Sequence, residues 1–268
     1  MKLALLAVLG LSATVQADDD VTPCADAVID PIVTPVRDGQ LDAQRGACLR
    51  QQISAGLGAH ALIDTPGFHG VLGGGLELGG SLIVAKAHEL SAALTLVDYT
   101  FVQNAVNKVS HVGYGPIVLG AAANGSIGRG ARGALALRIE VPITDDQTDT
   151  VRSSAQLLGV VSGALAGGVV LHARLGAIGR LTSSLGGETQ RLALVAGSDF
   201  AWQLRPRLAL HLGGETMAGW DVSVDHFLLR AGVHWRMRGA WRLRAGIGAP
   251  LGAERTNAIL DVAILVDR

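Results

Sequence analysis

The stretch FLLRAGVHWRMRGAWRLRAGIGAPL, residues 227–251, alternates large apolar residues with arginine and histidine. Before the break at Gly239, one set of alternate positions is apolar and the other is largely basic. The apolar set is Phe227, Leu229, Ala231, Val233, Trp235 and Met237, and the basic set is Arg230, His234, Arg236 and Arg238. Successive side chains of a strand point to opposite faces, so this period of two predicts a strand with one apolar face. The pattern restarts at Trp241, which predicts a β-hairpin.

The same alternation recurs from residue 51 to residue 268, in runs separated by polar or glycine-rich turns. These runs predict roughly twelve strands, each long enough to cross a bilayer at the tilt of a membrane barrel. Links between the runs alternate in length. Longer or more polar links are expected at 103–110, 144–152, 181–190 and 219–225, and tight ones near 166–168, 205–206 and 239. Barrels of the outer membrane show this inequality between their two ends.

Composition favours a membrane barrel over a soluble β-sandwich. Hydrophobic residues make up 49% of the chain and charged residues 17%, whereas soluble domains average about 25% charged residues. The polar strand faces carry mainly Gly, Ala, Ser and single Arg or His, which suits a narrow lumen. Lipid tolerates a sheet only when it is closed. We therefore expect an all-β fold, a closed antiparallel up-and-down transmembrane β-barrel, with a secreted soluble β-sandwich as the remote alternative.

The N-terminal region predicts export. Residues 1–17, MKLALLAVLGLSATVQA, have the basic start, apolar run and small-residue ending of a signal peptide cleaved after Ala17. Residues 18–50 are then expected to form a periplasmic segment before a barrel at 51–268. Cys24 and Cys48 are the only cysteines, and an oxidising compartment favours a disulfide between them. Two unpaired thiols are the alternative, and a metal site is not expected because no histidine lies between them.

The candidate functional residues are charged side chains on the polar strand faces, which a barrel would turn into its lumen. We call them the lumen charge cluster: Arg138, Glu140, His172, Arg174, Asp199, His211, Glu215, Arg230, His234, Arg236, Arg242 and Arg244. Its arginine excess favours anions, because rings of charge select permeating ions. The alternative is that these groups pair across the lumen and close it, since buried charges need partners.

Aromatic residues near the strand ends predict the two membrane interfaces, as in the girdles of such barrels. Trp202, Trp235 and Trp241 are on apolar faces close to tight turns, and Trp220 and Phe227 flank a link at the opposite end. Chance placement of few aromatic residues is the alternative, because Phe, Trp and Tyr make up only 4% of the chain.

Motifs for enzymatic chemistry are not persuasive. Gly128–Gly133 matches G-x-G-x-x-G but precedes a strand, so we interpret it as a turn. Gly159, Gly163 and Gly167 have the spacing of a helix-packing seam, yet their apolar run is short for a membrane helix. G-x-S-x-G and H-E-x-x-H do not occur. We expect no enzyme activity, cofactor or metal, and the net charge of −1 does not favour nucleic acid.

Together these features resemble the bacterial outer-membrane β-barrel proteins, over about residues 51–268. The resemblance implies an outer-membrane location, contact with outer-membrane lipid, a monomer, and the barrel-assembly machinery as a partner during biogenesis. It implies a passive channel for small solutes or a structural membrane protein, with a surface-binding barrel or a lipid-directed enzyme as alternatives. The phospholipase A group of this class has His-x-Ser-Asn on a strand, which this sequence lacks. Such proteins typically end in an aromatic residue, whereas the last residues here are Val266, Asp267 and Arg268.

A transmembrane barrel should resist dissociation by detergent until it is heated. We predict that the protein fractionates with outer membranes and that its gel mobility changes on boiling. Recovery in the soluble periplasmic fraction, with mobility independent of heating, would exclude the barrel.

Overall fold

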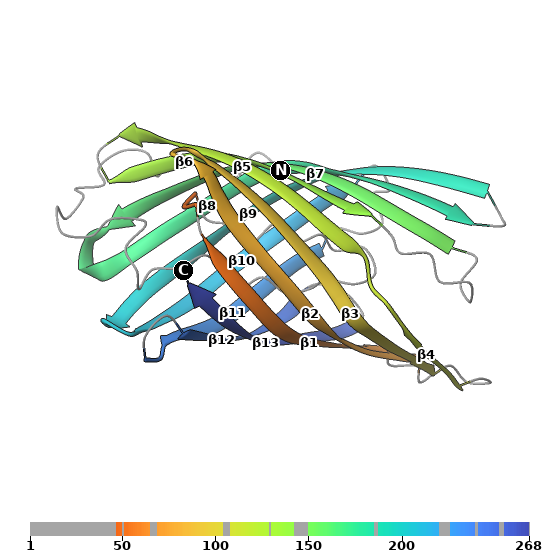
Figure 1. Cartoon of the computed structure of the whole chain (residues 1–268). Helices are drawn as coiled ribbons and strands as arrows, with labels where there is room; N and C mark the ends of the chain where they lie inside the picture. The colour runs from red at the N-terminus through yellow and green to blue at the C-terminus, as the bar shows by residue number, and fades with distance from the viewer. Residues whose placement is uncertain are drawn as a thin grey trace.

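The computed structural model describes residues 47–49, 51–64, 69–103, 108–128, 130–141, 150–184, 187–219, 226–238, 241–251 and 255–267. These residues form a single antiparallel sheet of 13 strands (Figure 1). The strands are β1 (Gln52–Asp64), β2 (His69–Ala85), β3 (His88–Gln103), β4 (Lys108–Gly113), β5 (Ile117–Gly128), β6 (Ala131–Val141), β7 (Thr150–Leu165), β8 (Val169–Ser184), β9 (Gly187–Arg205), β10 (Leu208–Gly219), β11 (His226–Arg236), β12 (Trp241–Leu251) and β13 (Arg255–Asp267). The described part of the chain contains no helix with the length and apolar character to cross a bilayer.

The sheet closes on itself. Consecutive strands pair with each other except β4 and β5, which both pair with β3. The ring is completed by β1, which pairs with β13 from Gln52 opposite Asp267 to Asp64 opposite Arg255. On its other side β1 pairs with β2, which pairs with β3, and β3 continues the ring through β5. Because β4 and β5 pair with successive parts of β3, they share one position, which leaves twelve positions for the 13 strands. The predicted closed barrel of about twelve strands is confirmed.

The division between β4 and β5 lies at Tyr114–Pro116, where the sequence already contains a strand breaker. Pro116 has no amide hydrogen for the ladder. The preceding Gly115 keeps contact with β3 by donating its N–H to the carbonyl of Thr95, at 3.0 Å. A Cβ built on Gly115 would overlap the Thr95 side chain. A glycine at this position therefore lets the interrupted strand lie close to β3.

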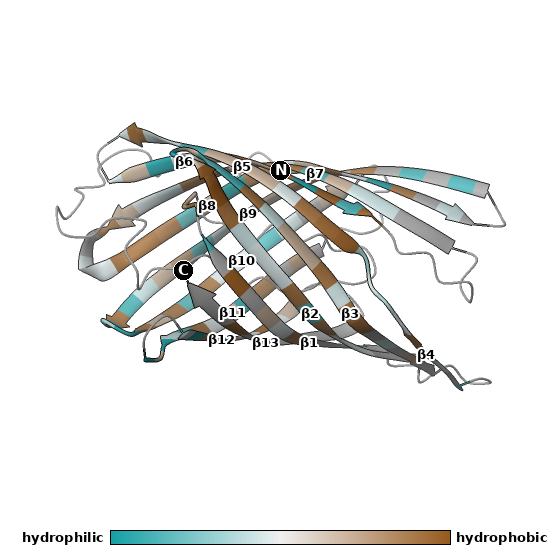
Figure 2. Cartoon of the chain, in the orientation of Figure 1, coloured by the Kyte–Doolittle hydropathy of each residue, from teal (hydrophilic) through white to brown (hydrophobic). Residues whose placement is uncertain are grey.

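The apolar strand faces point outward and the polar faces inward. Leu57, Leu175 and Leu212 expose 63%, 68% and 61% of their surface, whereas His172 and Arg174 on the alternate positions of β8 expose 1% and 4%. Figure 2 shows the resulting alternation of apolar and polar bands along the strands. A soluble sandwich would bury its leucines and expose its arginines. The distribution here is the reverse, as expected for a wall that contacts lipid.

The tight turns lie at the end of the barrel where β1 begins and β13 ends, which we call the tight-turn end. The β7–β8 turn is a single 3-10 turn, Ala166–Gly168, with left-handed φ values of 74° at Gly167 and 73° at Gly168 that glycine adopts without strain. The helix alternative for this region is thus excluded. Gly130, at φ 67°, forms the β5–β6 turn, so Gly128–Gly133 belongs to a hairpin. One prediction is wrong: β8 ends at Ser184 and β9 begins at Gly187, so 181–190 belongs mostly to strands.

Described aromatic residues lie on the outer surface where they were predicted. Trp202, Trp235 and Trp241 expose about half of their surface and lie near the tight-turn end. Phe227 is exposed near the start of β11, at the opposite end. Trp220 lies outside the described residues. Outward indole rings near one rim are consistent with a membrane interface there.

We predict that a charge on the outer wall destabilises the barrel according to its depth in the bilayer. Leu175→Arg, in the interior of β8, should lower the free energy of unfolding in lipid vesicles by about 2–4 kcal/mol, because the guanidinium enters hydrocarbon. The matched variant Leu204→Arg, next to the tight β9–β10 turn, should cost about 0–1 kcal/mol. Equal costs at the two positions would contradict a membrane-spanning exterior.

Candidate functional site: the polar lumen

All twelve members of the lumen charge cluster lie on inward strand positions. Nine of them are buried: His172, Arg174, Asp199, His211, Glu215, Arg230, His234, Arg242 and Arg244. Arg138, Glu140 and Arg236 are partly buried. The cluster therefore exists as a set of side chains inside the barrel, but the structure distributes it over several arcs of the wall.

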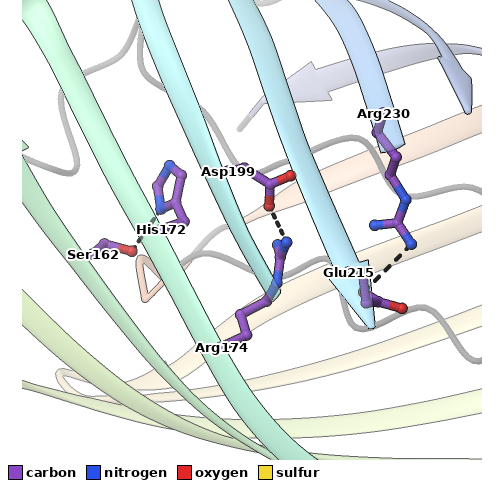
Figure 3. Close-up of polar contacts among 6 residues, drawn as sticks. All are labelled: Ser162, His172, Arg174, Asp199, Glu215 and Arg230. Atoms are coloured by element: carbon purple, nitrogen blue, oxygen red, sulfur yellow. Dashed lines mark hydrogen bonds and ion pairs between the residues drawn. The ribbon is translucent and has the colours of Figure 1, made fainter. Parts of the chain in front are cut away.

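Two ion pairs form the centre of the cluster. The guanidinium of Arg174 on β8 contacts the carboxylate of Asp199 on β9, and Nη2 of Arg230 on β11 lies 3.4 Å from Oε2 of Glu215 on β10 (Figure 3). Both pairs run diagonally between adjacent strands, because the residue directly opposite Asp199 on β8 is His172 rather than Arg174. All four side chains are buried, so each charge is compensated by its neighbour within the barrel.

Glycines opposite the charged residues make room for these pairs. Gly213 on β10 lies between two charged residues. Its register partner on β9 is Asp199, and its register partner on β11 is Arg230. A Cβ built on Gly213 would overlap the Asp199 carboxylate, and one on Gly197 would lie 3.5 Å from Nη2 of Arg174. The small residues of the polar faces thus have a steric function, since long side chains can lie flat only over neighbours without side chains.

A basic patch lies beside the ion pairs on the lumenal face of β11 and β12. Arg236 is the direct partner of Arg242, and His234 is the direct partner of Arg244. The ring of His234 is tilted by 48° against that of His211 on β10, with centroids 6.0 Å apart. These residues are near the tight-turn end of their strands. Basic residues thus lie directly opposite one another on this strand pair.

A serine–histidine pair that the sequence analysis did not identify lies on β7 and β8. Ser162 Oγ and His172 Nδ1 are 2.7 Å apart, with exposures of 0% and 1% (Figure 3). The two residues are equidistant in sequence from Gly167, the middle of the turn, and this symmetry was the available signal. Ser154 similarly donates its hydroxyl to Oε2 of Glu140, at 2.8 Å. These hydroxyls extend the polar network along β7.

An apolar wall lies next to the charged residues, on the lumenal faces of β5 to β9. It consists of the inward side chains Ala122, Ala136, Leu158, Val160, Ile178 and Val195. Ala47, which precedes the barrel, is packed against this wall and is fully buried. Sequence analysis gave no expectation of such a contact, because Ala47 belongs to no periodic run.

Several predictions concern residues outside the described ranges. Cys24 is one of them, so the disulfide with Cys48 stays a prediction, and so do the signal peptide and the division at residues 17 and 50. Of the segment 18–50, only residues 47–49 are described, and they lie at the barrel. In the described part of the chain, no three His, Cys, Asp or Glu side chains are grouped as a metal site.

Comparisons with known proteins agree on the architecture. No protein-family model matches the chain, and no curated protein matches its sequence. An outer-membrane channel from Pseudomonas putida F1 is similar in structure, with a TM-score of 0.62 at 12% identity, covering 86% of this chain and 99% of that one. The translocator domain of the autotransporter NalP from Neisseria meningitidis gives 0.58 at 10% identity, covering 82% and 89%.

The β domain of the Bordetella autotransporter BrkA is also similar, with a TM-score of 0.54 at 14% identity, covering 82% of this chain and all of that one (100%). At such identities the likeness extends to the fold. Similar barrels thus include both a channel and translocator domains, which do not share one function. The chain thus has the closed β-barrel fold of these proteins, with an apolar exterior.

We predict that the central ion pairs contribute strongly to stability. Asp199→Asn should lower the free energy of unfolding by about 3–5 kcal/mol, because it leaves the buried Arg174 charge without its carboxylate. Glu188→Gln, at an exposed position on the same strand, is the matched control and should have little effect. Denaturant unfolding in detergent micelles measures both. Wild-type stability of Asp199→Asn would show that the pair is dispensable.

Proposed function

We propose that this outer-membrane β-barrel is a narrow passive channel for small anionic solutes. The observation that carries the proposal is the basic patch on β11 and β12, where Arg236 faces Arg242 and His234 faces Arg244 across one strand pair. Charge at the lumen surface selects permeating ions by sign. The two strands contain four arginines and no Asp or Glu, and this excess of basic residues favours an anionic solute over a cation.

The other charged residues of the lumen are consistent with a preference for anionic solutes near this patch. Arg174 with Asp199 and Arg230 with Glu215 form compensated pairs, so they add little net charge. The carboxylates Glu77 and Glu89 are on β2 and β3, on another arc of the wall. On the neighbouring strand β13, Asp261 is the register partner of Gly246, so basic residues exceed acidic ones along β11 to β13 but are not the only charged residues there.

The width of the lumen restricts what passes. Arginine and histidine side chains from β8 to β12 project into the barrel, and their burial shows that little solvent surrounds them. A barrel of this strand number has an interior that side chains largely fill. The proposed solutes are accordingly small anions, and the similarity in fold to an outer-membrane channel supports passage as a class of function.

A structural membrane protein without conductance is the second candidate, and the ion pairs favour it because they bridge neighbouring strands inside the barrel. Lipid-directed hydrolysis has less support. Its serine and histidine should be accessible from the membrane, whereas Ser162 is wholly buried on the lumenal face beside His172. Channel and structural functions are separated by one measurement, which is conductance.

We predict that the purified protein conducts in planar bilayers with a preference for chloride over potassium. Arg236→Gln/Arg242→Gln should lower the chloride-to-potassium permeability ratio at least threefold, because it removes two positive charges from the lumen. The double variant Lys86→Gln/Arg238→Gln removes the same charge from exposed positions and is the control.

Reversal potentials in a salt gradient measure this ratio. A cation preference of the wild type, or equal ratios in the two double variants, would reject anion selection by the patch. Complete electrical silence of the wild type and of all variants would favour the structural function.

A further inference from the structure

We propose that residues Ala47–Leu49 form an internal plug that obstructs the lumen at the tight-turn end. These residues belong to no strand, yet Ala47 exposes 0% and Cys48 3% of their surface. A segment outside the sheet is buried to this extent only when something covers it on all sides. Here the covering surface is the lumenal face of the barrel itself.

Both polar main-chain groups of Ala47 have partners on the wall. Its N–H donates to Ser162 Oγ on β7 at 2.8 Å, and its carbonyl accepts from Asn124 Nδ2 on β5 at 3.1 Å. Ser162 is in turn bonded to His172 on β8. Burying an unpaired backbone N–H or C=O group is costly. Because both of these groups of Ala47 bond to side chains of the wall, Ala47 has a defined binding position there, which we call its seat.

The Ala47 methyl group completes the apolar wall. It packs with Leu158, Val160 and their neighbours in one buried cluster, and Leu49 lies against the same cluster. Three residues of this wall, Ala122, Ala136 and Leu158, form one register row as successive partners on β5, β6 and β7. The small alanines of that row leave the space that the segment occupies.

The position of this seat makes the segment an obstruction. Ala47 contacts β7, whereas the chain enters β1 only at Gln52. In the ring, β7 is five positions from β1 through β2, β3, β5 and β6, and seven in the other direction, so the two strands face each other across the lumen. The chain from Ala47 to Gln52 reaches at most about 18 Å when extended. This reach is too short for a link that follows the wall from β7 to the start of β1.

The seat can be tested without reference to conductance. In Ser162→Ala/Asn124→Ala, both hydrogen bonds to Ala47 are lost, and hydrogen–deuterium exchange at the Ala47 amide should accelerate at least tenfold in the detergent-solubilised full chain. Thr216→Ala/Gln190→Ala removes a hydroxyl and an amide side chain from exposed positions on β10 and β9 and should leave this exchange unchanged. Ala122→Phe, which fills the seat from the wall, is a second variant with the same expected acceleration.

The obstruction is tested by single-channel conductance, and this part rests on the proposed channel function. Ser162→Ala/Asn124→Ala should raise the conductance at least twofold, and Thr216→Ala/Gln190→Ala, at exposed positions, should not. Heat-modifiable gel mobility confirms that each variant is folded. A wild-type Ala47 amide that exchanges as fast as an unstructured peptide overturns the seat, and accelerated exchange without higher conductance overturns the obstruction.

The two proposals fail in different ways. If the conductance of Ser162→Ala/Asn124→Ala rises but anions are not preferred, the segment is an obstruction and the proposed selectivity is wrong. If anions are preferred and the conductance stays at the wild-type level, the selectivity holds and the obstruction is wrong. Silence of all variants rejects the channel and the obstruction together.

Discussion

Pairing of every backbone amide within the sheet is the constraint on which this structure depends. Hydrocarbon offers no hydrogen-bond partners, so an open sheet edge in lipid would leave a row of N–H and C=O groups unsatisfied. The ring from β1 to β13 removes both edges, and the pairing of Gln52–Asp64 with Arg255–Asp267 completes it. Even the interrupted strand at Pro116 retains a hydrogen bond to β3 through Gly115. The outer leucines and the inner arginines are arranged on this closed ladder.

Closure of the sheet also determines how the inward side chains must pack and pair. A ring of this size turns half of its side chains inward, where there is limited room and no bulk water to solvate each charge. The barrel meets this requirement in two ways. On β8 to β12, charged side chains pair diagonally over glycines, as Arg174 and Asp199 do beside Gly197 and Gly213. On β5 to β9, a second group of inward residues is apolar and packs with Ala47 in one cluster.

Sequence periodicity was sufficient to predict most strands and which of their faces is apolar, because a period of two depends only on neighbouring residues. It predicted that Arg174 and Asp199 would share the polar side, and that Leu175 would be on the apolar side. It could not predict which arginine meets which carboxylate, since that depends on register between strands and on space left by Gly213. The hydrogen bond between Ser162 and His172 was not predicted for the same reason, although His172 itself was. Ala47 could not be found from any period, because its burial depends on the completed barrel.

The pairing of β1 with β13 has a kinetic consequence. The two strands that complete the ring are separated by nearly the whole described sequence, so the last contact to form carries the largest loop-closure entropy. Until β1 and β13 pair, the sheet has two unpaired edge strands, and such edges can pair with other chains. Ala47 is covalently just ahead of β1, and its seat on β7 lies across the interior. If Ala47 binds to β7 before β1 pairs with β13, the segment does not have to enter a barrel that is already closed.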